Sequence, residues 1–111
     1  MKIIRSKKDK QNPCVQISIK MLDDSNISLK TKGFIAYCLS KTDDWTFYVE
    51  QLALVLKEKK SAIYSAIQEA IFNGYCIKHQ PRNDKGRVLS FEYIISDSKE
   101  ELQRFRDELK I

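Results

Sequence analysis

The clearest pattern of apolar and polar positions lies in residues 52–75, LALVLKEKKSAIYSAIQEAIFNGY. In its second half apolar side chains recur at i, i+4, i+7 and i+8, which places them on one face of a helix. They are Ile63, Ile67, Ala70 and Ile71. The opposite face carries Ser61, Tyr64, Ser65 and Gln68. We predict a short helix, a tight turn and a second helix that ends at Asn73-Gly74, with one face for packing and one free to touch a partner.

Helical and extended segments are also predicted upstream of this region. Ser28 can cap a helix that runs to about Ser40, whose apolar positions include a core-facing stripe. Before it, Ile19–Leu22 predicts a turn or a short helix. The aromatic and β-branched run Trp45–Val49 predicts a short strand that leads into the next helix. The tryptophan of this run is the only one in the chain, and we expect it at the edge of the core.

A β-hairpin with a basic tip is predicted after the second helix. Residues 75–80 and 87–95 are typical of two strands, and residues 81–86 between them have the composition of a turn. The basic side chains of the tip are Arg82, Lys85 and Arg87. A solvated loop would account for them as well, but the place of the hairpin in the chain favours a binding role.

The chain ends in a predicted helix, Ser98–Lys110, that is mostly charged. Its apolar side chains Leu102, Phe105 and Leu109 lie at i, i+3 and i+7, which makes one narrow stripe. We predict a homodimer in which two copies bury this stripe against each other. The alternative is that the helix folds back onto its own chain.

Length and charge indicate the class of protein. The 111 residues suffice for one domain with its own core, and we divide them into a flexible basic arm (1–12), a folded domain (13–96) and the C-terminal helix (97–111). Twenty Lys and Arg against fifteen Asp and Glu give a formal charge of +5. Five basic residues and one acidic residue lie in the arm, whereas residues 41–56 are net acidic. Such uneven basic charge favours a polyanion as partner.

Cysteine usage and the lack of long apolar runs indicate a cytosolic protein. Cys14, Cys38 and Cys76 are odd in number and widely spaced among apolar residues, so we expect buried free thiols in a reducing compartment. No apolar run approaches the roughly 20 residues that span a bilayer. The apolar part of the N-terminal segment is too short for a secretory signal.

The sequence offers no catalytic or metal-binding constellation. With a single histidine, His79, no two-histidine metal site can form within one chain. Cys76 lies three residues before His79 on a predicted strand, so the two side chains point to opposite faces. The adjacent Asp23 and Asp24 are typical of a loop or cap, because neighbours in sequence do not face one site. We expect no enzymatic activity, no metal, no cofactor and no small-molecule substrate.

The turn before the second helix is unusually basic for its position. A helix N-terminus carries partial positive charge, yet Lys57, Lys59 and Lys60 surround it with only Glu58 to offset them. An external anion such as a DNA phosphate, held by backbone N–H groups and ammonium groups together, would explain this placement. The alternative is that the lysines only keep a surface turn soluble.

The order of the predicted elements, helices followed by a hairpin, is that of a winged helix-turn-helix. Three blocks of the sequence, SLKTKGFIAYCLSKTDDWTF, VEQLALVLKEKKSAIYSAIQEAIFNGYCIK and RNDKGRVLSFEY, also resemble a known family. They are similar to the winged-helix domains of phage and plasmid replication initiators and their helix-turn-helix relatives in low-GC bacteria. The resemblance runs from about Val15 to Ile95. It implies an α+β fold with a three-helix core and a β-hairpin wing, to which this chain adds a C-terminal helix.

The resemblance also implies a DNA-binding surface. Positions that match the family's DNA-facing residues in the turn and second helix are Lys57, Lys60, Ser61, Tyr64, Ser65 and Gln68. Those that match its wing are Arg82, Lys85 and Arg87. This chain departs from the family pattern at two positions, with Lys59 where glycine is usual and Tyr48 where serine or threonine is usual.

The function implied is binding of double-stranded DNA, in plasmid or phage replication initiation or in local transcription regulation, in the bacterial cytoplasm. The alternative is a winged helix used as a protein–protein interaction module without DNA binding of its own. In that case Tyr64, Phe72 and the C-terminal stripe would dock a partner. Salt dependence separates the two, because phosphate contacts weaken steeply with salt and an apolar interface does not.

Overall fold

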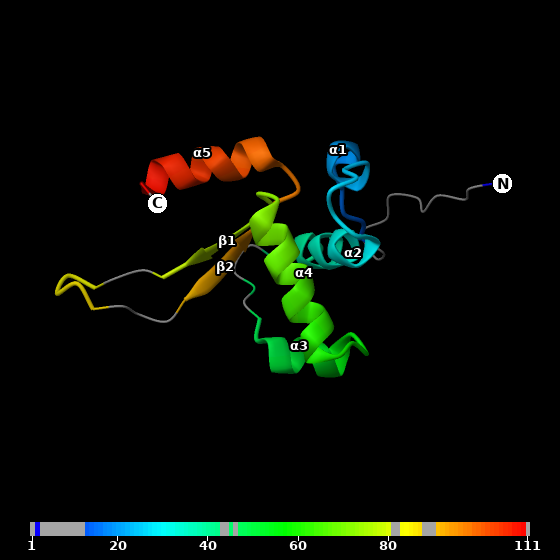
Figure 1. Ribbon diagram of the computed structural model, residues 1–111, viewed down its shortest axis with the longest axis horizontal. Helices are drawn as coiled ribbons and strands as arrows, with labels where there is room; N and C mark the ends of the chain where they lie inside the picture. Colours follow the sequence, from blue (N-terminus) through cyan, green and yellow to red (C-terminus); the bar gives the residue numbers. More distant parts are fainter. Residues whose placement is uncertain are drawn as a thin grey trace.

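The computed structural model describes residues 2, 13–42, 45, 47–80, 83–87 and 91–110. Over these residues the protein is α+β, as predicted, with five helices and one two-stranded antiparallel sheet (Figure 1). In chain order the elements are α1 (Ile19–Leu22), α2 (Leu29–Leu39), α3 (Val49–Val55), α4 (Lys60–Phe72), β1 (Cys76–His79), β2 (Glu92–Ile95) and α5 (Lys99–Leu109). Apart from Lys2, the predicted basic arm 1–12 lies outside the described residues.

Helix α4 is the element on which α2, α3 and β1 pack. Both α2 and α3 pack against it, and the hairpin β1–β2 leaves from its C-terminal end (Figure 1). Its predicted apolar face is confirmed, because Ile63, Ile67 and Ala70 are buried and Ile71 is half-buried. The side chains predicted for the opposite face are all exposed. Burial of one stripe thus fixes which side of α4 stays open to solvent.

The C-terminus of α4 is built as its sequence predicts. Gly74 has φ +87°, the left-handed conformation that glycine adopts without a steric cost. Its N–H donates to the carbonyl of Ile71 at 3.2 Å, and the N–H of Tyr75 donates to that of Ala70 at 2.9 Å. This pair of bonds is a Schellman motif, which satisfies the last carbonyls of the helix and turns the chain into β1.

The helix N-termini fall into two groups. The hydroxyl groups of Ser18, Ser28 and Ser98 accept backbone N–H bonds at the starts of α1, α2 and α5. By contrast, Tyr48 and Lys59 occupy the cap positions of α3 and α4 and make no capping side-chain bond in the described part of the chain.

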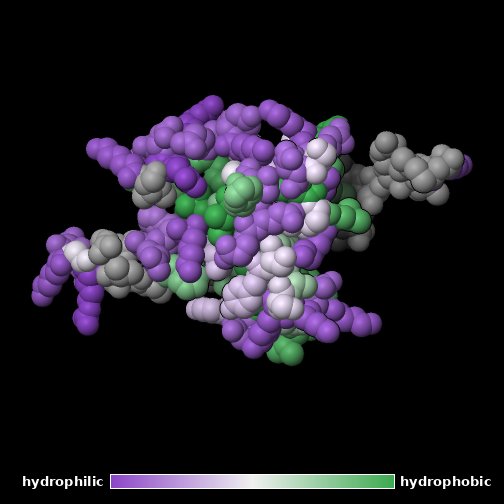
Figure 2. Space-filling view, viewed as in Figure 1, coloured by the Kyte–Doolittle hydropathy of each residue, from purple (hydrophilic) through white to green (hydrophobic). Residues whose placement is uncertain are grey.

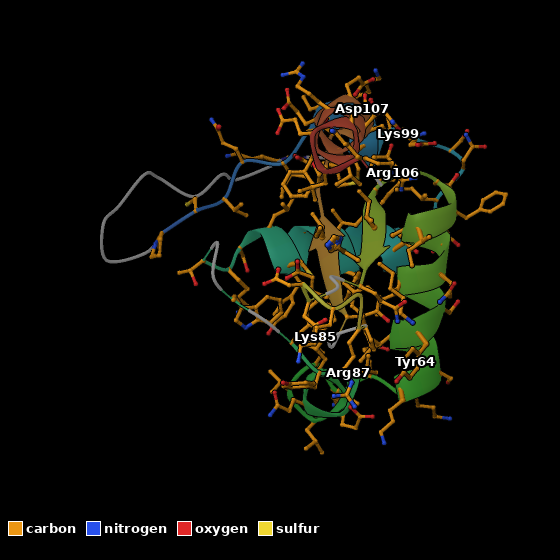
Figure 3. All side chains as sticks on the ribbon, turned by 90° about the vertical axis from the view of Figure 1, so that its left-hand side faces the viewer. Tyr64, Lys85, Arg87, Lys99, Arg106 and Asp107 are labelled. Atoms are coloured by element: carbon orange, nitrogen blue, oxygen red, sulfur yellow. The ribbon has the colours of Figure 1, made fainter. Side chains whose placement is uncertain are left out.

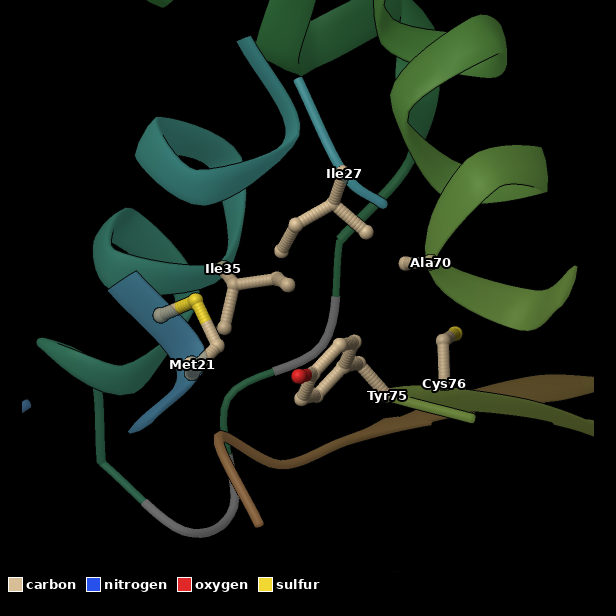
Figure 4. Packing of buried hydrophobic residues seen from close by; sticks show 6 residues of the cluster. All are labelled: Met21, Ile27, Ile35, Ala70, Tyr75 and Cys76. Atoms are coloured by element: carbon tan, nitrogen blue, oxygen red, sulfur yellow. The ribbon is translucent and has the colours of Figure 1, made fainter. Parts of the chain in front are cut away.

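The core consists of two clusters of buried side chains that follow one another along the buried face of α4. One joins α1, α2, α4 and β1 and contains Met21, Ile27, Ile35, Ala70, Tyr75 and Cys76 (Figure 4). The other joins α2, α3 and α4 and contains Phe34, Val49, Leu52, Ile63, Ala66 and Ile67. Tyr93 and Ile95 of β2 pack against both clusters, so the base of the hairpin is fixed to the helices.

The hairpin pairs Cys76 with Ile95 and His79 with Glu92. Its tip is a tight turn in which Gly86, at φ +76°, donates its N–H to the carbonyl of Asn83 at 2.9 Å. The N–H of Asn83 in turn donates to the carbonyl of Arg87 at 2.9 Å. A three-residue loop closed in this way, with glycine in the left-handed position, is a common hairpin connection. The return strand starts at Glu92, later than the predicted residue 87, and residues 88–90 between them lie outside the described part.

Helix α5 lies against its own chain. Lys20 of α1 pairs with Glu100 at 2.8 Å, and Asp24 pairs with Lys99 at 3.2 Å. Leu102 is 4% exposed within one copy, whereas Phe105 and Leu109 remain 39% and 43% exposed. Folding back therefore buries one of the three residues of the predicted stripe and leaves two open.

Two predictions about individual segments are wrong. The described residues of Trp45–Val49 form no strand, since none of them pairs with a described strand, although α3 does begin at Val49. Cys14 is exposed, unlike buried Cys76 and half-buried Cys38. Burial raises the pKa of both the Cys38 and the Cys76 thiol to about 12. No helix in the described part is long and apolar enough to cross a membrane.

Candidate nucleic-acid interface

The exposed face of α4 is bounded by a different element on each side. On one side Tyr64, 43% exposed, approaches the hairpin. The pKa of Tyr93 on β2 is raised mainly by burial, and also by the nearby Cys76 thiol and Tyr64 hydroxyl. Tyr64 is thus close enough to the hairpin to act on Tyr93. On the other side the ammonium of Lys30, from the first turn of α2, donates to the hydroxyl of Ser65 at 2.9 Å. Ser61 and Gln68 lie between these flanks and are exposed.

Lys30 is a member of this surface that the sequence did not reveal. It stands 35 residues before Ser65 and belongs to α2, whose N-terminal turn is held against α4 by Glu69. The carboxylate of Glu69 accepts the backbone N–H of Ser28, the main cause of its lowered pKa. The only available signal was that Lys30 lies in the first turn after the capping Ser28, which says nothing about its neighbour in space.

The basic turn places three exposed lysines around the start of α4. Lys57 has φ +57°, Lys59 is the cap residue with extended backbone, and Lys60 is the first helical residue. None of the three forms an ion pair with any other described residue. No described side chain caps α4, and the N–H of Ala62 donates to the carbonyl of Lys59 at 3.0 Å, which leaves the N–H groups of Lys60 and Ser61 for an external acceptor. The turn thus combines the features of an anion-binding helix end.

The tip of the hairpin presents two further exposed cations, Lys85 and Arg87. Their backbone N–H groups both donate to the side-chain oxygen of Asn83, at 3.0 and 2.9 Å, which holds the turn in shape. In Figure 3 these residues and Tyr64 lie in the lower half of the molecule, whereas the labelled residues of α5 lie at the opposite end. Arg82, the third predicted residue of the tip, lies outside the described residues.

The predicted dimer residues lie at the α5 end of the molecule, away from the basic turn. Beside them a hollow of about 680 Å³ separates α5 from the end of α4, with Ile71, Phe72 and Leu102 among its lining residues. Phe72 is 90% exposed. Figure 2 shows apolar surface in this region, directly below the hydrophilic side chains of α5.

Comparisons with known proteins add no relative to this picture. No family model matches the chain, and no significant match was found among curated proteins or among solved structures. The described residues also contain no group of three or more histidine, cysteine or acidic side chains arranged to hold a metal ion.

Proposed function

We propose that this protein is a winged helix-turn-helix protein that binds double-stranded DNA. In this proposal α4 is the recognition helix, the α3–α4 turn holds phosphate and the hairpin is the wing. The observation that carries it is the start of α4, where a helix end without a side-chain cap and three lysines with no ion pair to a described residue lie beside an exposed polar face. The element order and the sequence resemblance support the same assignment.

The proposed DNA contacts are of two kinds: phosphate contacts that position the protein and base contacts that recognise the sequence. Lys57, Lys59 and Lys60, with Lys85 and Arg87 of the wing, bind phosphate groups and set the orientation on the duplex. The exposed face of α4 faces base edges in the major groove, where Gln68 can bond adenine through two groups. Lys30 adds a cation beside Ser65 on the same face. The sequence resemblance supports a role in plasmid or phage replication or in local transcription control.

The phosphate contacts are tested by removing single lysines. We expect Lys57→Ala and Lys60→Ala to weaken binding to all duplexes alike. Each should reduce the slope of log affinity against log salt by about 1, the value for one lost phosphate contact. Lys110→Ala, an exposed lysine at the far end of α5, is the matched control and should change neither quantity. Unchanged duplex affinity of the Lys57→Ala, Lys60→Ala double variant at low salt would refute the phosphate site.

A protein–protein module is the second candidate function. The exposed ring of Phe72 beside the hollow under α5 favours it, because an exposed large apolar side chain next to a concave surface is typical of a docking site. Under this alternative the binding of a partner would depend little on salt, and Phe72→Ala would weaken it while Lys60→Ala would not.

A further inference from the structure

Five aromatic side chains, which we call the aromatic row, extend in mutual contact from the end of α2 to the outer part of the hairpin. In order they are Tyr37, Trp45, Phe47, Tyr93 and Phe91. The distances between successive ring centroids are 6.1, 5.2, 5.6 and 5.3 Å. Phe47 also meets the buried ring of Phe34 edge-on at 5.9 Å, which fixes the middle of the row to the core.

The aromatic row lies at the border between core and surface, since Tyr37, Trp45, Phe47 and Tyr93 pack against the core cluster that joins α2, α3 and α4. None of its five members is buried, and Phe91 at its outer end is 48% exposed. Because side chains alternate along a strand, Phe91 and Tyr93 lie on the same face of the hairpin as Lys78. Glu92, between them in sequence, lies on the opposite face. The face that carries the rings is therefore free of the carboxylate of β2.

A lysine lies at each end of the aromatic row. The ammonium of Lys41 is 4.4 Å from the centre of the Tyr37 ring and 5.9 Å from that of Trp45. The ammonium of Lys78 is 4.3 Å from the centre of the Phe91 ring. Neither lysine forms an ion pair with another described residue. Farther along the hairpin, Lys85 and Arg87 continue the positive charge to the tip.

We propose that the aromatic row, with Lys41 and Lys78, binds single-stranded nucleic acid. Unpaired bases stack on aromatic rings whatever their identity, and unpaired lysines beside the rings attract the phosphates that link them. In a duplex the bases are already stacked on each other, so the row would not compete with α4 for the same ligand. An apolar protein partner fits less well, because it would bury both ammonium groups without a counter-charge. The proposal is independent of duplex binding by α4.

The test uses Trp45, the only tryptophan, as an intrinsic probe in the full chain. We expect a single-stranded oligothymidylate to quench its fluorescence in a saturable way. Phe91→Leu, which keeps an apolar side chain but removes the ring, should weaken this binding about 5-fold or more, the effect of losing one stacked base. Phe91→Tyr should restore it. Leu54→Ala, which shortens an exposed apolar side chain of α3 outside the row, is the control and should have no effect.

Three results would overturn the proposal. The first is the absence of binding to the oligothymidylate by both fluorescence and anisotropy. The second is that Phe91→Leu and the unmodified protein bind the oligothymidylate with equal affinity and that inorganic polyphosphate displaces it completely. Binding would then depend on charge alone and not on stacking. The third is loss of single-strand binding in Lys57→Ala, Lys60→Ala, which would place the strand on the α4 surface. Duplex binding is measured separately on the same double variant. Failure of the single-strand proposal can therefore be distinguished from failure of the duplex proposal.

Discussion

At the scale of single residues, Lys57 combines a backbone cost with an exposed charge. Its φ of +57° lies in the left-handed region, which costs a residue with a Cβ atom about 1–2 kcal/mol. The position directly follows Leu56, the cap at the end of α3, where glycine is the usual residue. A lysine here is locally unfavourable both in conformation and in its nearness to Lys59 and Lys60. The turn thus departs from the most stable choice at the point where an anion is proposed to bind.

We expect Lys57→Gly to separate stability from binding. Glycine removes the left-handed strain but makes the unfolded chain more flexible, so the net gain in free energy of unfolding should be at most about 1 kcal/mol. Duplex affinity should fall as far as in Lys57→Ala, because both variants lose the ammonium group. Urea unfolding and a binding titration on the two variants measure these effects. A Lys57→Gly protein less stable than Lys57→Ala would show that strain at this residue is not what limits stability.

At the scale of elements, the position of α5 depends on polar contacts with the segment around α1. Asp24 connects them, because its carboxylate accepts the Tyr75 hydroxyl at 2.6 Å and pairs with Lys99 at 3.2 Å. The side chain of Asp24 is 10% exposed. Its pKa is lowered mainly by the bond from Tyr75, then by the backbone N–H of Asn26. In return, burial and the Asp24 carboxylate raise the pKa of Tyr75.

This connection makes stability depend on pH in a defined direction. A carboxyl group with a lowered folded pKa stabilises the protein above its unfolded pKa of about 3.9, and the contribution is lost as pH falls through the folded value. We expect Asp24→Asn to lower the free energy of unfolding at pH 7, with a difference from the unmodified protein that shrinks below about pH 4. Urea unfolding across this pH range measures it, with the exposed Asp107→Asn as control. A difference that stays constant with pH would contradict the assigned role of Asp24.

At the scale of the whole molecule, the two ends carry different kinds of surface. In Figure 1, α5 with its partly exposed stripe lies along the upper edge, the basic turn between α3 and α4 lies at the lower edge, and the hairpin extends to the left, away from that turn. A second copy that covered Phe105 and Leu109 would therefore leave the basic turn at the start of α4 free. Two recognition helices in such a pair could meet half-sites about one DNA turn, roughly 34–36 Å, apart.

The predicted homodimer is tested by sedimentation of the intact chain. We expect a dimer at micromolar concentration, and a monomer for Phe105→Ser, Leu109→Ser, because these substitutions remove the apolar stripe that remains exposed in one copy. Leu54→Ser on α3 is the matched control, since Leu54 is 86% exposed and far along the chain from α5. An intact chain that stays monomeric at these concentrations would rule out this dimer.

Local chemistry allowed the sequence to predict most elements of the described chain. The capping serines before α2 and α5, the Schellman glycine after α4 and the turn residues of the hairpin tip each act within a few residues. The helical period of Ile63, Ile67 and Ala70 likewise determined the buried face of α4, and with it the exposed face of the candidate site. Trp45–Val49 was misjudged because strand propensity becomes a strand only where another strand can pair with it.

Only the tertiary structure decided which distant residues meet. The packing of α2 across α4 brings Lys30 to Ser65, and the turn of the chain after α4 brings Tyr75 to Asp24, 51 residues earlier. The aromatic row likewise joins rings from α2, the segment before α3 and β2. Neither the period of a helix nor the composition of a turn determines the angle at which two elements cross. That angle depends on how all the buried side chains pack together.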